Sequence, residues 1–299
     1  MKPARILCVG VSTLDQIFKV QHFPVPGEKT RATDFTQVSG GNAGNAAIAA
    51  ARLGGNVLLS SPLADDLIGA SIRKLLEKEN VDCSNAVIVP GGMSPLSAIV
   101  VDATGERTIV SRRSPNLAEA RWKEADRVLA AVDAVLIDNR FPEFSLDVAR
   151  KARKYDVPIV MDADEPTRMT KDLFAASTHI IFSAHGLRDT TELADPEESL
   201  RKIADLTDAY VSVTSGSAGA IWLENGEIRR DRAFKVEAVD TLGAGDVYHG
   251  AFALALGEGQ DEASARRFSA AAAALKCTRF GGIAGSPTRP ELEAFLATL

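Results

Sequence analysis

The stretch "VDTLGAGDVYHGAFALAL" (residues 239–256) links a β-type run, residues 234–239, to an apolar helix. Between them, Gly243, Ala244 and Gly245 are followed directly by Asp246. Unpaired backbone N–H groups at a helix N-terminus bind anions, and such donors stabilise a transferring phosphoryl group. The stretch therefore predicts an anion-binding turn with a carboxylate at its edge.

Asp246 is the candidate base of this turn. The helix dipole is expected to keep its carboxylate ionised, by ~0.3–1 kcal/mol, which makes it a weak base. A weak base suffices in phosphoryl transfer, because the attacking hydroxyl loses its proton late in a loose transition state. The alternative is an ordinary Asp in the first turn of a helix. That alternative explains the acid but not the Gly-Ala-Gly before it.

The turn differs from the two common nucleotide motifs. No Gly-Lys-Ser/Thr follows the glycines, as a Walker P-loop requires, and Tyr248 stands at the third glycine position of a dinucleotide fingerprint. Residues 10–15, after the first predicted strand, also lack the glycine turn of a nicotinamide-dependent oxidoreductase. This second α/β class is therefore disfavoured.

Outward from this stretch, strands alternate with helical stretches of about 10–15 residues, which predicts βαβ units and a mostly parallel sheet covered on both faces. The first strand, residues 5–11, is a continuous apolar run typical of a buried parallel strand. Further strands are predicted at residues 57–60, 134–138, 157–161, 179–182, 209–213 and 219–223. Helices are predicted at residues 42–53, 66–79, 118–130, 144–155, 196–206, 246–257, 261–278 and 289–298.

Two segments differ from this pattern. Residues 14–39 and 94–113 each contain two runs of alternating apolar and polar side chains around a turn, which is typical of half-buried hairpins. We expect them to form a small β-sheet that stands off the main one. The chain is interpreted as one α/β domain, residues 1–299, with a β lid from about 12–39 and 94–114.

Composition restricts the possible partners. The 299 residues are 45% hydrophobic and 25% charged, as in an ordinary soluble globular protein. A net charge of −6 gives no reason to expect nucleic acid or an anionic membrane as partner. No apolar run reaches the roughly 18 residues of a membrane span. Three cysteines without a CxxC pair argue against a disulfide framework or a zinc site, and they favour a reducing cytoplasm.

A second glycine motif, "SGGNAGNAAIAAARLGG" (39–55), lies between a strand and an Ala-rich helix. At Gly40, Gly41 and Asn42 the backbone is able to approach a polar ligand closely, and the helix N-terminus offers further donors. A tight turn with alanines packed on the sheet is the open alternative. Asp15 follows the first strand at its carboxyl end, where α/β proteins bind ligands, and is either a sugar ligand or a turn residue.

A third motif, "VTSGSAGAIWLENG" (213–226), reads as strand, glycine turn and strand. Its Thr214, Gly216 and Gly219 offer a hydroxyl and backbone donors to phosphates, whereas a plain hairpin turn is the alternative. The pattern GxSxG is absent around Ser217, which argues against an acyl hydrolase. The four histidines show no metal-ligand spacing and are interpreted as structural.

In this order, and over essentially the whole chain, the motifs resemble those of the ribokinase-like (PfkB) carbohydrate kinases. "GGNAGNAAIAAARLGG" is similar to the family's N-terminal glycine signature, "VTSGSAGA" to its nucleotide strand-turn, and "VDTLGAGDVYHGAFALAL" to its C-terminal signature. The resemblance implies a three-layer αβα sandwich with a β lid. It also implies ATP-dependent phosphorylation of a sugar, and a homodimer formed through the lid.

The resemblance further implies roles for individual residues. Asp246 would take the proton of the sugar hydroxyl, beside an anion hole formed by the backbone of Gly243, Ala244 and Gly245. The sugar would be held by Asp15, Gly40, Gly41, Asn42 and Asn45, and ATP by Thr214, Gly216, Ser217 and Gly219. A monovalent cation such as K⁺ would bind near Asp240, Arg279, Gly281 and Gly285.

One element of the family is missing. Many relatives have an Asn-x-x-Glu element that organises Mg²⁺, and Ser183 and Gly186 stand at those places here. We expect Mg²⁺ to be held through water and the ATP phosphates alone, which magnesium tolerates well.

Within the family, "AALKCTRFGGIAGSP" (273–287) and "IWLENG" are most similar to the sulfofructose kinases, which phosphorylate the C1 hydroxyl of 6-deoxy-6-sulfofructose. A sulfonate needs cationic or amide donors, and arginine suits it best. The candidates are Lys29, Arg112, Arg113 and Arg140, each of which has a solvated surface charge as its alternative. Arg140 stands out because it follows a buried strand directly. Ser111 stands where that subgroup leads us to expect an Asn.

Two alternatives stay open at this point. Another sugar of the family, such as ribose, fructose, 2-keto-3-deoxygluconate or a nucleoside, could be the acceptor. A non-catalytic sugar or nucleotide sensor could have the same fold, although the intact "GAGD" argues against it.

Overall fold

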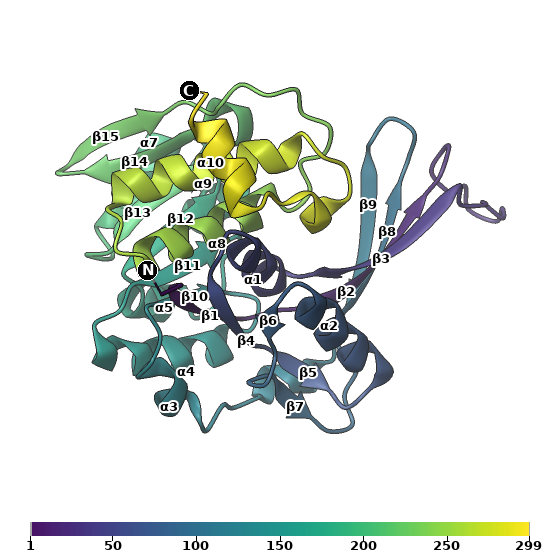
Figure 1. Ribbon diagram of the computed structural model, residues 1–299, viewed down its shortest axis with the longest axis horizontal. Coiled ribbons are helices and arrows are strands. Elements are labelled where there is room, and N and C mark those ends of the chain that lie inside the picture. Colours follow the sequence, from purple (N-terminus) through teal and green to yellow (C-terminus); the bar gives the residue numbers. More distant parts are fainter. Residues whose placement is uncertain (1, 299) are drawn as a thin grey trace.

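A nine-stranded sheet forms the centre of the computed structural model, which describes residues 2–298 (Figure 1). Its strands are β1 (Arg5–Val9), β4 (Asn56–Ser60), β6 (Val81–Asp82), β10 (Ala134–Asp138), β11 (Ile159–Ala163), β12 (His179–Ser183), β13 (Tyr210–Thr214), β14 (Ala220–Glu224) and β15 (Glu227–Asp231). Their order is β15-β14-β13-β12-β11-β10-β1-β4-β6. The strands from β6 to β13 pair in parallel, and β14 and β15 extend the sheet antiparallel. The predicted mostly parallel sheet is therefore confirmed.

Helices cover both faces of this sheet and complete the predicted three layers. One face packs against α1 (Asn42–Arg52), α2 (Leu67–Lys78), α8 (Ala244–Gly257), α9 (Glu262–Cys277) and α10 (Arg289–Leu296). The other packs against α3 (Ala125–Leu129), α4 (Pro142–Ala152), α5 (Thr170–Ala176), α6 (Ala184–Thr191) and α7 (Pro196–Ala204). Short 3₁₀ turns occur at η1 (Pro115–Glu119), η2 (Arg153–Tyr155), η3 (Gly216–Ala218) and η4 (Gly282–Gly285). Among the described helices, none combines the length and apolar character that a membrane span requires.

A smaller sheet projects from the body of the fold (Figure 1). It contains β2 (Thr13–Lys19), β3 (Asp34–Gly40), β8 (Leu96–Val101) and β9 (Arg107–Arg112), in the order β3-β2-β8-β9. The two predicted hairpins, β2–β3 and β8–β9, are antiparallel, and a parallel β2–β8 pair joins them. A further two-stranded sheet pairs β5 (Pro62–Ala64) with β7 (Val87–Val89).

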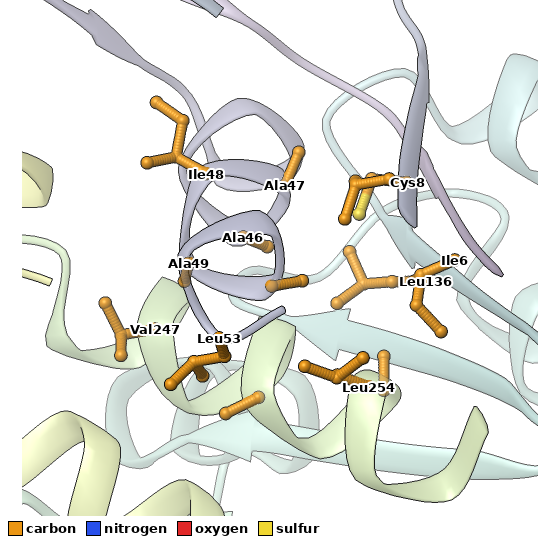
Figure 2. Packing of buried hydrophobic residues seen from close by; sticks show 14 of the residues in the cluster. Ile6, Cys8, Ala46, Ala47, Ile48, Ala49, Leu53, Leu136, Val247 and Leu254 are labelled. Carbon is orange, nitrogen blue, oxygen red and sulfur yellow. The ribbon is translucent and has the colours of Figure 1, made fainter. Parts of the chain in front are cut away.

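Helices α1 and α8 pack closely because their facing side chains are small. Figure 2 shows α1, which carries Ala46 and Ala49, next to α8, with Leu254 of α8 beside Ile6 and Leu136 of the sheet. The two helices approach closely at Gly250, where an added Cβ would lie 2.3 Å from the backbone oxygen of Ala46. This close packing sets the relative position of the two helix N-termini, which lie at the same edge of the main sheet.

Two predicted elements are wrong, and other elements were missed. Residues 232–238 form no strand, and the N–H groups of Val239 and Asp240 instead donate to the Cys277 oxygen at the end of α9. The predicted helix 118–130 is broken into η1 and α3, because Ala120 and Trp122 are both buried but would point about 160° apart on one helix. The sequence patterns also missed α5 and α6, and the edge strand β15.

Candidate functional site

A cavity of about 550 Å³ lies at the carboxyl ends of the parallel strands, between the main sheet and the smaller one. Ligands bind at this edge in open α/β sheets. From the predicted sugar site it is lined by Asp15, Gly41, Asn42, Asn45, Ser111 and Arg140, and from the predicted phosphoryl site by Gly243, Gly245 and Asp246. Gly40 lies beside it, where an added Cβ would lie 2.0 Å from the Asp15 carboxylate.

Asp246 and Asn45 meet at the N-terminal ends of α8 and α1. The Asn45 Nδ2 atom donates to the Asp246 Oδ2 atom at 2.7 Å, across 201 positions of sequence. Gly243 is the N-cap of α8 with φ of 79°, a left-handed conformation that favours glycine. It places Asp246 in the first turn of the helix, as predicted.

The turn before α8 presents backbone donors to the cavity. Within residues 2–298, the N–H groups of Gly243 and Gly245 have no protein acceptor. The Ala244 N–H instead donates to the Thr241 oxygen at 3.2 Å. Two glycine N–H groups are therefore available to an anion beside the Asp246 carboxylate.

The charge state of Asp246 differs from the expectation. Burial raises the pKa of Asp246 well above its usual value, and the nearby Asp162 charge raises it further, while the hydrogen bond from Asn45 opposes them. The carboxylate is partly accessible from the cavity but is otherwise enclosed by protein. The predicted low pKa is therefore wrong, because desolvation and like charges outweigh a helix dipole.

Asp162 lies at the end of β11 and has two polar neighbours. Asn42 Nδ2 donates to its Oδ2 atom at 2.9 Å, and His249 Nδ1 lies 3.5 Å from the same oxygen. His249 is one turn after Asp246 on α8, is buried, and its Nε2 lies 3.3 Å from the Ile181 oxygen. Burial raises the pKa of Asp162, and the His249 charge opposes this. His249 lines the cavity, whereas the sequence offered only a structural interpretation.

Asp138, at the end of β10, accepts hydrogen bonds from the segments that follow β1 and β10 and from the first turn of α1. Its Oδ2 atom accepts from Val11 N at 2.7 Å and Ala43 N at 3.1 Å, and its Oδ1 atom accepts from Arg140 N at 3.0 Å. Burial raises the pKa of this carboxyl to about 7, although these N–H groups oppose the rise. Sequence reasoning missed Asp138, Asp162, Asp164 and His249. The sequence did contain a signal for the three acids, because "LIDNR" and "MDAD" each place an acid at the carboxyl end of a buried strand. That position is the one that identified Asp15 as a candidate.

Arg140 lines the cavity but is not a free cation. Its guanidinium forms ion pairs with Asp164 and Glu165 on the loop after β11. Two carboxylates therefore already surround the arginine that the sequence favoured for a sulfonate. Their presence is a long-range feature that the local pattern "LIDNR" does not contain.

The smaller sheet supplies a different set of cations. Arg107, Arg112 and Arg113 line the cavity, and within residues 2–298 none of them pairs with a carboxylate. Partial burial lowers the pKa of Arg113, and the Arg140 charge lowers it further. Lys29 does not line the cavity, because it lies in the exposed turn between β2 and β3.

A second cavity of about 570 Å³ adjoins the first, with Thr214 and Gly245 lining both. The predicted nucleotide residues Gly216, Ser217 and Gly219 line it at the β13–β14 hairpin. The opposite wall contains alanines of α9, with the Arg266 guanidinium 3.6 Å from the centre of the Trp222 ring nearby. A largely apolar cleft that includes the unpaired N–H group of Gly245 is suited to a nucleoside triphosphate.

The two residues at the missing Asn-x-x-Glu element offer no free metal-binding side chain, and Gly186 leaves no room for one. Ser183 Oγ accepts from Gly186 N at 2.9 Å, and an added Cβ at Gly186 would lie 2.4 Å from the Ala163 oxygen. Among the described residues, no group of three His, Cys, Asp or Glu side chains is arranged to hold a metal ion. That Mg²⁺ enters bound to ATP and water, where it would neutralise phosphate charge, stays a prediction.

The region predicted to bind a monovalent cation has a protein cation in it. The Lys276 Nζ atom donates to the Asp240 backbone oxygen at 2.8 Å. Gly281 N and Gly282 N both donate to Asp240 Oδ2, at 3.1 and 2.8 Å, and the Arg279 side chain pairs with Glu291. An added Cβ at Gly285 would lie 3.0 Å from the Arg279 oxygen, so the loop is tightly packed.

Comparisons with known proteins agree with this geometry. Residues 3–289 match the pfkB family of carbohydrate kinases. Ribokinase of Bacillus subtilis strain 168 is 31% identical over 297 residues, which cover 98% of this chain and 100% of the relative. The crystal structure of a putative ribokinase from Agrobacterium tumefaciens is similar with a TM-score of 0.94 and 38% identity, covering 99% of this chain and 98% of the other. The ribokinase structure from Thermotoga maritima has a TM-score of 0.84 at 28% identity, with 99% of both chains covered.

The sheet order, the projecting small sheet and the two joined cavities define a ribokinase-like sugar kinase that depends on ATP. The chain belongs to the PfkB family of carbohydrate kinases. It is accordingly an enzyme that transfers a phosphoryl group to an alcohol.

Proposed function

We propose that this kinase transfers the γ-phosphoryl group of ATP to a primary hydroxyl of a sugar that has an anionic group at its far end. The best candidate is the C1 hydroxyl of 6-deoxy-6-sulfofructose. The observation that supports an anionic sugar is the set of three unpaired arginines, Arg107, Arg112 and Arg113, that line the same cavity as Asp246. An uncompensated group of cations in a cavity favours an anionic ligand.

In the proposed reaction, Asp246 accepts the proton of the attacking sugar hydroxyl. Asn45 holds the carboxylate oxygen in place through its 2.7 Å hydrogen bond. The free N–H groups of Gly243 and Gly245 stabilise the charge on the transferring phosphoryl group. Asp15, Gly41 and Asn42 bind the sugar hydroxyls, and Thr214, Gly216, Ser217 and Gly219 lie along ATP. The small sheet closes over both substrates as a lid and excludes water.

The sugar is tested by ATP turnover with sulfofructose, fructose, fructose 6-phosphate, ribose, 2-keto-3-deoxygluconate and adenosine. We expect the highest kcat/KM with sulfofructose. The named relatives are ribokinases, so ribose is the second candidate. A kcat/KM for ribose or fructose above that for every anionic sugar would overturn the proposed substrate class, but it would not affect the proposed base.

Replacing Arg113 tests the anion contact directly. Arg113→Gln should lower kcat/KM for the anionic sugar by about 10- to 150-fold, because a hydrogen bond between charged groups contributes about 1.5–3 kcal/mol. Fructose, which has no anionic group, should be affected about twofold at most. Arg31→Gln is the matched control, since it removes one exposed positive charge from the connection between β2 and β3, and Arg31 does not line the cavity. Equal losses for both sugars in Arg113→Gln would exclude the contact.

The raised pKa of Asp246 predicts the pH profile. The base must be ionised, so kcat/KM should rise with pH through an apparent pKa above that of an ordinary Asp. Asp162→Asn removes the negative charge that raises the pKa of Asp246 most, so the rise of kcat/KM should move to lower pH. Asp164→Asn should move it less, because the Asp164 charge contributes less to the shift. If the rise of kcat/KM in Asp162→Asn stays at the same pH or moves to higher pH, the Asp162 charge is not a cause of the raised pKa of Asp246.

Assembly and location stay predictions. Phe35, Ile109 and Val110 of the small sheet are 49%, 48% and 69% exposed, which supports a homodimer formed through the lid. All three cysteines are free thiols, which supports a reducing cytoplasm. A potassium requirement is not proposed, because the Lys276 ammonium already lies against the Asp240 oxygen.

A further inference from the structure

Lys276 is a fully buried lysine in the last turn of α9, with 0% of its side chain exposed. Its Nζ atom donates to the backbone oxygen of Asp240 at 2.8 Å and lies 3.4 Å from the Asp240 Oδ2 atom. Burial lowers the pKa of Lys276, and the Asp240 charge opposes this. A lysine is almost never fully buried unless it is paired, so Asp240 is the partner that makes this position possible.

Asp240 organises the segment that leads into the anion-binding turn. Its carboxylate accepts from Leu242 N at 2.8 Å, and from Gly281 N and Gly282 N of the loop after α9. The N–H groups of Val239 and Asp240 donate to the Cys277 oxygen. Gly243 follows this segment directly. The position of its N–H group therefore depends on the contacts between Asp240 and the end of α9.

The ligands of the Lys276 ammonium are those that a small monovalent metal ion would use. A backbone carbonyl oxygen and a carboxylate oxygen face a single positive charge whose side chain is fully buried. Backbone oxygens of the loop after α9 also accept from a cationic side chain. Arg52 Nη1 donates to Ala284 O at 2.7 Å and to Ser286 O at 3.0 Å. Protein cations therefore lie against the oxygens of Asp240 and against those of Ala284 and Ser286 in the loop after α9.

We propose that the Lys276 ammonium replaces a monovalent metal ion as the cation that fixes residues 239–242, so that this kinase works without K⁺ or Na⁺. Lys276 lines neither cavity and is a positioning residue that acts through Asp240 and the glycine turn. The inference rests on the proposed role of the Gly243 and Gly245 N–H groups.

The first test compares turnover of the unchanged enzyme in choline chloride and in potassium chloride at equal ionic strength. The two rates should agree within about twofold. Lys276→Ala in choline chloride should lose at least about tenfold in kcat, since each 1.36 kcal/mol of lost transition-state stabilisation is a factor of ten. Ammonium or K⁺ should restore part of this loss, because either ion fits the space that the side chain leaves.

Two controls separate positioning from general stability. Lys276→Met fills most of the space with an uncharged chain and should be slow without recovery by either ion. Lys202→Ala removes an ammonium that also donates to a backbone oxygen, that of Thr191 at 2.8 Å, but on α7. The kcat of Lys202→Ala should be the same in choline chloride as with K⁺ or ammonium.

A readout without sugar keeps the test independent of the acceptor. The melting temperature of Lys276→Ala should rise with K⁺ or ammonium more than that of the unchanged protein, whether or not any sugar is turned over. The proposal is overturned if the unchanged enzyme loses tenfold in choline chloride. It is also overturned if neither the rate nor the melting temperature of Lys276→Ala responds to these ions. If Lys276→Ala does not fold, the comparison of the unchanged enzyme in the two salts still tests whether the kinase works without K⁺.

Discussion

Asp246→Asn should lower kcat by about 10²–10⁴-fold, the range that a general base contributes. The Asn side chain has nearly the same shape and can still bond with Asn45, but it cannot accept the proton of the sugar hydroxyl. KM for the sugar should change little, because the hydrogen-bonding contacts in the cavity persist. The measurement is ADP release at saturating sugar and ATP.

Stability separates this result from unfolding. The pKa of Asp246 is raised in the folded protein, so its ionised form is less favourable there than in the unfolded chain at neutral pH. Asp246→Asn should therefore melt at least as high as the unchanged protein near neutral pH. The difference should shrink as pH falls through the pKa of the folded carboxyl. Asp208→Asn, at an exposed position outside both cavities, is the control and should leave turnover unchanged. Near-normal turnover of Asp246→Asn would exclude this residue as the base.

Gly250→Ala should destabilise the protein by about 1–3 kcal/mol or more, because an added methyl group overpacks the contact between α1 and α8. Its Cβ would lie 2.3 Å from the Ala46 oxygen and 2.9 Å from the Ala46 carbonyl carbon, which are backbone atoms. The helices must separate, and the hydrogen bond between Asn45 and Asp246 lies on this contact. A displacement of about 1 Å at a reacting group can cost about 10²-fold in rate. We therefore expect losses in both melting temperature and kcat.

Gly245→Ala is the matched stability control on the same helix. An added Cβ there has no heavy atom within 4 Å, so the melting temperature should stay near that of the unchanged protein. A Gly250→Ala protein that melts like Gly245→Ala would show that α1 and α8 tolerate separation, and it would contradict the packing argument.

Much of the fold could be predicted because its signals are local. Continuous apolar runs between helical stretches predicted the parallel sheet, and two alternating segments predicted the small projecting sheet. Predictions failed where a local pattern competes with distant contacts. The run 234–239 has strand-like residues, but Cys277 takes the N–H groups of Val239 and Asp240. Helix α6 begins at a Ser183 N-cap and was missed because its apolar pattern is short.

Some features of the candidate site could also be predicted from local sequence, and others could not. "GAGD" alone predicted a glycine turn, free N–H groups and a carboxylate in the first turn of a helix, because helix termini are determined by neighbouring residues. The sequence patterns did not predict that Asp162 and His249 lie beside Asp246, that Arg140 is paired, or that the Lys276 ammonium lies on Asp240.

What the sequence by itself determined is therefore the chemistry available at each helix end and strand end, since this depends on residues within a few positions of one another. What only the tertiary structure decided is the charge of those groups. The pKa of Asp246 depends on burial and on Asp162, a residue 84 positions earlier in the chain. Desolvation and Coulomb interactions act through space, and the distances that set them exist only in the folded chain.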